Sequence, residues 1–85
     1  IGLVDRLVPA GSDRPAALEL ARGIARNSPV AVRAAKRALR RGAAADLRTG
    51  LEVEDAAWRT VAASADRKEG IAAFNEHRDP HWPGE

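Results

Sequence analysis

The sequence predicts an all-α fold of about four helices that follow a short extended segment at the N-terminus. Three observations support this prediction. Apolar residues recur at spacings of three and four along most of the 85 residues, which is the periodicity of an amphipathic helix. Each periodic stretch is preceded by a residue that favours a helix start, such as Ser or Asp. Alanine makes up half of the hydrophobic residues, and faces of small alanine side chains let helices approach closely.

Residues 1–11 are predicted to form an N-terminal strand and turn, and residues 12–85 a helical region. The segment from Ile1 to Pro9 mixes β-branched and apolar residues and ends at a proline, which is typical of a short strand or an extended segment. Gly11 and Ser12 then favour a turn.

The first helix is expected from about Asp13 to Arg26. Ser12 is a candidate N-cap, and Pro15 falls in the first turn, where its missing N–H group is not needed. The apolar residues of this stretch share one helical face. They are Ala17, Leu18, Ala21, Ile24 and Ala25.

The second helix has the clearest boundaries. Ser28 is a candidate N-cap, Pro29 occupies the first helical position and Gly42 marks the end. The stripe expected to be buried consists of Ala31, Val32, Ala35, Ala38 and Leu39.

The third helix is expected from about Asp46 to Ala63, with Asp55 and Arg59 spaced for an ion pair. Its apolar face consists of Leu47, Leu51, Trp58, Val61 and Ala62. Glu54 projects from the middle of this face, where an unpaired charge would be costly. Three interpretations are open: Glu54 forms a structural ion pair, the helix face is only partly covered, or burial adapts Glu54 for general acid–base chemistry.

The fourth helix is expected to start at Ser64 or Asp66 and to end before Pro80. Asp66 and Glu69 have the spacing of a capping box. Gly50 and Gly70 lie inside predicted helices, where glycine costs about 1 kcal/mol relative to alanine. We therefore expect another backbone or a ligand to approach closely at these glycines.

Composition excludes several classes of site. The chain has no cysteine, so disulfides and thiolate chemistry are excluded. The net charge of +2 is too small to indicate a nucleic-acid partner by itself. Only 19 residues are large and apolar, so the helices are expected to pack against something else, either the rest of a longer chain or another subunit.

Two polar groupings allow a functional interpretation. A basic stripe on the second helix would suit an anion, or it would pair with acids of the third helix on a solvated face. This stripe consists of Arg33, Lys36, Arg37, Arg40 and Arg41. His77 and His81 have the i,i+4 spacing of metal ligands, but Pro80 between them breaks the helix. We predict no metal site.

Three stretches, read in order, resemble the C-terminal third of the enoyl-CoA hydratase/isomerase (crotonase) family. They are residues 2–9 (GLVDRLVP), 28–39 (SPVAVRAAKRAL) and 64–78 (SADRKEGIAAFNEHR), followed by Pro80 and Trp82. The resemblance implies the helical C-terminal oligomerisation and lid part of a crotonase-like α/β enzyme. It also implies that the catalytic carboxylates and the oxyanion hole belong to a preceding core, so no catalytic residue is expected in this chain.

The resemblance further implies contact with coenzyme A. Phe74 matches the family's phenylalanine, whose ring would cover the adenine, and His77 stands where the family has a phosphate-binding lysine. A histidine is mostly neutral at pH 7, so it is a weaker cation than lysine. Trp58 and Trp82 are candidates for an acyl pocket or a subunit interface. The alternative for Phe74 and Trp82 is plain packing.

The family resemblance implies hydration of 2-enoyl-CoA as the simplest activity of the parent protein, with isomerisation also within the family. It implies no cofactor besides the coenzyme A of the substrate, a trimer or hexamer, and no nucleic-acid or membrane partner. A cytoplasmic location is the default. The alternative is a stand-alone helical module that binds a partner or oligomerises through the Arg33–Arg41 stripe.

Overall fold

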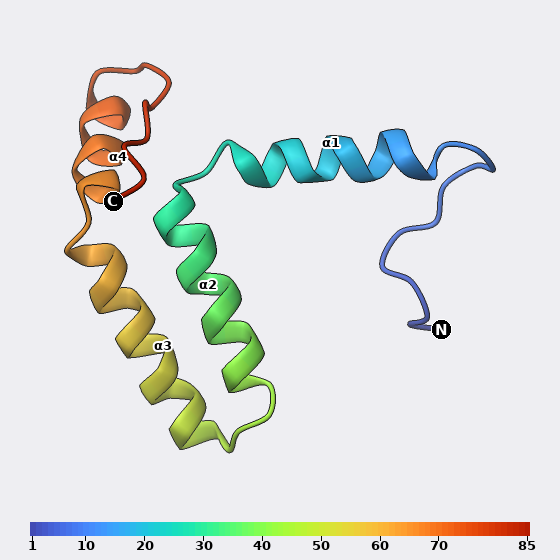
Figure 1. Cartoon of the computed structure of the whole chain (residues 1–85), viewed down its shortest axis with the longest axis horizontal. Coiled ribbons are helices and arrows are strands. Elements are labelled where there is room, and N and C mark those ends of the chain that lie inside the picture. Colours follow the sequence, from blue (N-terminus) through green and yellow to red (C-terminus); the bar gives the residue numbers. More distant parts are fainter.

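The computed structural model describes all residues from Ile1 to Glu85. It contains four helices and no strand (Figure 1). The helices are α1 (Asp13–Ala25), α2 (Pro29–Gly42), α3 (Leu47–Ala62) and α4 (Ala65–Asn75). The all-α prediction is confirmed. The segment from Ile1 to Pro9 is irregular and forms no strand, because no other strand is present to pair with it. The division at residue 11 stays a prediction.

The chain is open rather than compact. Its radius of gyration is 16.1 Å and its extents are 43 × 39 × 18 Å, whereas a compact domain of this length has a radius of about 12 Å. Its accessible surface is 7198 Å², against about 4,900 Å² for a compact monomer of this mass. Only five residues are buried. They are Ser28, Ala34, Ser64, Asp66 and Ala73.

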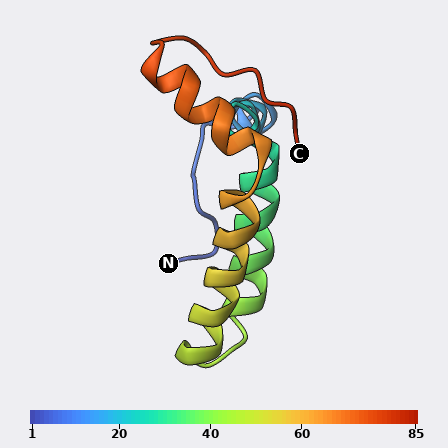
Figure 2. The ribbon, with the colours of Figure 1, turned by 90° about the vertical axis from the view of Figure 1, so that its left-hand side faces the viewer.

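Helices α2 and α3 lie side by side and run antiparallel (Figures 1 and 2). Small residues let the two helices approach. Ala34 is 1% exposed, and a Cβ atom at Gly50 would lie 3.8 Å from the carbonyl oxygen of Gly42. The close approach expected at Gly50 is therefore confirmed. Ser28 and Asp46 cap the two helices, accepting from the N–H groups of Ala31 and Thr49.

The predicted buried stripes of α2 and α3 are partly wrong. Ala35 and Leu39 are exposed, and so are Leu47, Leu51 and Trp58. The hairpin turns small residues inward because they allow the closest contact between helices, and the large side chains are left on an outer face. These leucines help to line an open hollow of about 680 Å³. Glu54 lies at this hollow, exposed and in no ion pair.

Helix α1 extends away from the start of α2 and buries no residue (Figure 1). The turn before it is confirmed: Gly11 has φ +80°, and the Ser12 N–H donates to the Pro9 carbonyl at 3.0 Å. Ser12 occupies the N-cap position, but its side chain makes no capping hydrogen bond. This start is therefore weaker than that of α2.

The predicted capping box of Asp66 and Glu69 is wrong. Ser64 is the N-cap of α4, and its Oγ accepts from the Arg67 N–H at 3.1 Å. Asp66 therefore lies inside the first turn of α4 rather than at its N-cap, and the carboxylates of Asp66 and Glu69 accept from more distant partners.

Helix α4 ends in a Schellman motif at the left-handed residue His77, with φ +53°. The Arg78 N–H donates to the Ala73 carbonyl at 3.1 Å, and the His77 N–H donates to the Phe74 carbonyl at 3.3 Å. This turn sends residues 78–85, here called the tail, back along α4 (Figure 1).

Candidate functional site

The two residues predicted to contact coenzyme A lie at the C-terminal end of α4. The ring of Phe74 is 80% exposed, which is unusual for a large aromatic side chain in a folded chain. His77 is also exposed and lies just beyond the helix, with its backbone N–H bonded to Phe74. The Schellman turn therefore places both residues at one exposed end of the helix. Their contact with coenzyme A stays a prediction.

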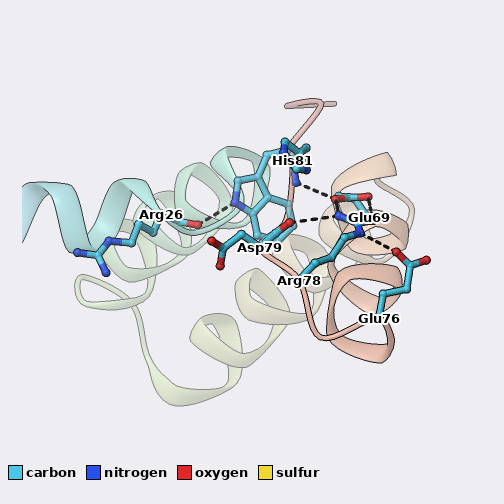
Figure 3. Close-up of polar contacts among 7 residues, drawn as sticks. Arg26, Glu69, Glu76, Arg78, Asp79 and His81 are labelled. Atoms are coloured by element: carbon cyan, nitrogen blue, oxygen red, sulfur yellow. Dashed lines mark hydrogen bonds and ion pairs between the residues drawn. The ribbon is translucent and has the colours of Figure 1, made fainter.

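The tail is attached to α4 by a charged cluster (Figure 3). Arg78 binds both carboxylate oxygens of Glu69, at 2.6 and 3.1 Å, and also Glu76 at 2.6 Å. The His81 N–H donates to Glu69 at 2.7 Å. These donors, the Arg78 guanidinium first, lower the pKa of Glu69 to about 2. The same ion pairs raise the pKa of Arg78 above its ordinary value.

Trp82 connects the tail to two helices. Its indole N–H donates to the carbonyl of Arg26, just after α1, at 2.8 Å (Figure 3). A Cβ atom at Gly70 would lie 3.3 Å from two carbons of the indole ring. A close approach at Gly70 therefore does occur, but the neighbour is this side chain and not the backbone or ligand that was expected. Trp58 lies elsewhere, more than half exposed on α3. An acyl-pocket or interface role for either tryptophan stays a prediction.

A buried carboxylate that the sequence indicated only as part of a capping box lies where three segments meet. Asp66 is 1% exposed and accepts from Ser28 Oγ at 2.6 Å, from the Gly84 N–H at 2.6 Å and from the Val30 N–H at 3.3 Å. Burial raises the pKa of Asp66, but the bonds from Ser28, Gly84 and Val30 outweigh it and hold the pKa below its usual value. No spacing in the sequence reveals this cluster, because the partners lie 18 to 38 residues from Asp66 in the chain.

The five residues of the basic stripe are all exposed on α2. None forms an ion pair with an acid of α3. Arg33 instead donates to the carbonyl of Gly84 at 3.2 Å. The expected pairing within α3 does occur, with Arg59 and Asp55 at 2.8 Å.

Two further features concern metal ions and membranes. No group of three or more His, Cys, Asp or Glu side chains is placed to hold a metal ion. No helix combines the length and the apolar character needed to cross a membrane.

Comparison with known proteins identifies the family. The enoyl-CoA hydratase/isomerase family model matches residues 1–85. The crystal structure of an enoyl-CoA hydratase from Bacillus anthracis superposes with a TM-score of 0.93 at 45% identity, covering 99% of this chain and 33% of that one. The 2,3-dehydroadipyl-CoA hydratase of Escherichia coli K12 is 42% identical over 83 residues, which are 98% of this chain and 32% of that protein.

A more distant relative is the human mitochondrial methylglutaconyl-CoA hydratase. It is 38% identical over 89 residues, which cover 100% of this chain and 26% of that protein. The chain thus spans about a third or less of the length of these relatives. Its helices correspond to the helical part of a crotonase-fold protein. The resemblance seen in the sequence is confirmed, and the chain belongs to the enoyl-CoA hydratase/isomerase family.

Proposed function

We propose that this chain is the helical part of an enzyme that hydrates 2-enoyl-CoA thioesters, and that α4 contributes to its coenzyme A site. Three relatives described above are hydratases by name, and two of them are named for particular CoA thioesters. The observation that carries the proposal is the exposed ring of Phe74, held at the end of α4 at the position of the family's phenylalanine.

The reaction adds water across the 2,3-double bond of the thioester. Its groups would be a carboxylate acid–base pair and two backbone N–H donors that stabilise the enolate oxygen. We assign these groups to sequence outside this chain. Phe74 would stack on the adenine, and His77 would face the phosphate end as a weaker cation than lysine. No cofactor is needed beyond the coenzyme A of the substrate.

Assembly into a homo-oligomer, a trimer or a hexamer, is the second part of the proposal. The supporting observation is the outer face of the hairpin, where Leu39, Leu47 and Trp58 are exposed. An apolar surface of this kind requires a neighbour, which is either the rest of the protein or another subunit. For the location we propose the cytoplasm, although the human relative is mitochondrial.

The test is made on the complete protein that carries this chain. Hydration of crotonyl-CoA is followed by the loss of enoyl-thioester absorbance, and binding of free coenzyme A by calorimetry. Phe74→Ala is expected to weaken coenzyme A binding about tenfold, the loss expected for one base–aromatic stack. Ile71→Ala, on the same helix and half exposed, is the matched control and should leave binding unchanged.

Two results would contradict the proposal. Absence of hydration would remove the assigned reaction. Impaired assembly in Phe74→Ala, with unchanged coenzyme A affinity per assembled site, would show that Phe74 only packs at an interface.

A second candidate is a helical module that binds a polyanion through the basic stripe. The observation that favours it is that the stripe is exposed and forms no ion pair. Binding to duplex DNA with a steep salt dependence would support this candidate. Binding that is lost at physiological salt, together with active hydration, would reject it.

A further inference from the structure

We infer that Asp66 is a positioning residue: it fixes the direction in which α4 projects from the hairpin and thereby places Phe74 in the coenzyme A site. The role of Phe74 rests on the proposed function. The contacts by which Asp66 connects the start of α4 to the start of α2 and to the tail, here called the joint, all lie within this chain.

The Asp66 carboxylate connects three segments. Its Oδ2 accepts from the Ser28 hydroxyl and the Val30 N–H at the start of α2, and its Oδ1 accepts from the Gly84 N–H of the tail. A backbone contact reinforces this joint, since the N–H groups of residues 65 and 66 donate to the Glu85 carbonyl at 2.7 and 3.2 Å. The start of α4 is thus held to the start of α2 and to the returning tail.

Apolar packing holds α4 only weakly. Ala73 is its only buried apolar residue, and Ile71 and Phe74 point largely into solvent. Helix-to-helix packing is concentrated between α2 and α3, with little between α3 and α4. The direction of α4 therefore depends on hydrogen bonds at its start and on the tail, which Trp82 fastens to Arg26 and Arg78 fastens to Glu69.

The distance between Asp66 and Phe74 turns a small tilt at the joint into a large displacement of the Phe74 ring. Phe74 lies eight residues beyond Asp66, or ~12 Å along the helix axis at 1.5 Å per residue. At that distance a tilt of about 10° at the joint moves the Phe74 ring by roughly 2 Å. Stacking on an adenine does not tolerate such a displacement, because base and ring must lie face to face.

A direct chemical role for Asp66 is disfavoured by the same contacts. The carboxylate is buried, and three donors of the chain itself occupy its oxygens. A general base needs a free oxygen within reach of the substrate proton. Asp66 therefore acts through the helix that it holds.

The experiment uses the complete protein and a double-mutant cycle. Asp66→Asn keeps the size of the side chain, but its amide nitrogen cannot accept hydrogen bonds. The dissociation constant for free coenzyme A is measured per assembled site in Asp66→Asn, Phe74→Ala and the double variant. Hydrogen exchange of the Val30 and Gly84 amides reports on the joint. Asp55→Asn, on the exposed pair with Arg59, is the matched control.

The expected results follow from a shared pathway. Asp66→Asn raises the dissociation constant about tenfold, as loss of the stack does, and the amide that faces the new nitrogen, Val30 or Gly84, loses protection. The double variant binds no more weakly than Phe74→Ala alone, because both changes remove one interaction. Ser28→Ala, which removes one of the three donors, shows a smaller rise with the same coupling and serves if Asp66→Asn does not assemble.

A failure of this inference and a failure of the proposed function give different results. Effects of Asp66→Asn and Phe74→Ala that multiply, or retained protection of both the Val30 and the Gly84 amides in Asp66→Asn, overturn the inference. Unchanged affinity in Phe74→Ala overturns the proposed function instead, whatever the amides of the joint show.

Discussion

The α2–α3 hairpin and the unit formed by α4 and the tail are held together by different forces. In the hairpin, Ala34 and two glycine backbones pack at short range, and the polar groups lie outside. In the α4–tail unit, the contacts are made by the buried carboxylate of Asp66, the ion-paired carboxylate of Glu69 and the indole N–H of Trp82. Ala73 is the one buried alanine of this unit. Close packing of small residues therefore stabilises the hairpin, and hydrogen bonds and ion pairs stabilise the α4–tail unit.

The largest effect is expected from overfilling the hairpin. Ala34→Leu adds a branched side chain at a position that is only 1% exposed, and overpacking of this kind costs about 1–3 kcal/mol. The measurement is the unfolding midpoint in denaturant of the complete protein. Ala35→Leu, one position along on the exposed side, is the control. An equal loss at both positions would contradict the described orientation of α2.

Glycine substitutions compare the two regions directly. Alanine favours the helical state by up to about 1 kcal/mol over glycine. Gly50→Ala should gain most of this, since its new Cβ meets the hairpin backbone at an ordinary 3.8 Å. Gly70→Ala should gain less or lose, since its Cβ would lie 3.3 Å from the Trp82 ring. Thermal unfolding measures both. A larger gain at Gly70 would show that the tail is not seated on α4.

The smallest effect is expected from titrating the α4–tail cluster. Arg78 and the His81 N–H lower the pKa of Glu69 from 4.5 to about 2. The stability that Glu69 contributes is thus complete above pH 4.5 and is lost as the pH falls toward 2. Solvent screens this cluster, so the contribution is modest.

The measurement for this cluster is the difference in melting temperature between the native protein and Glu69→Gln, followed from pH 6 down to pH 2. The difference should shrink across that range. Glu52→Gln, in an exposed ion pair with Arg48, should show little difference at any pH. A Glu69 difference that is independent of pH would contradict the role of its charge.

The sequence predicted the local features of the fold. The N-cap Ser28 and the end of α2 at Gly42 follow from local hydrogen bonding and backbone preference. Helical periodicity identified all four helices. The buried faces were harder to predict, because in an alanine-rich helix the small residues at the contact and the large residues outside it share the same periodicity.

The polar contacts of the α4–tail unit could not be predicted in this way. Asp66 meets Ser28 across 38 residues and Trp82 meets Arg26 across 56. The positions of Phe74 and His77 came from family resemblance. Only Gly70, a glycine inside a helix, gave a local signal, and it indicated that something lies close without identifying it.

The 18 Å thickness of the chain determines where substitutions can stabilise this protein. An α-helix with its side chains is about 10–12 Å across, so the chain is less than two helices deep. Neighbours from this chain alone bury only five of its residues. Substitutions that strengthen it therefore act at the edges where helices meet, while each broad face is free to diverge with whatever surface it meets.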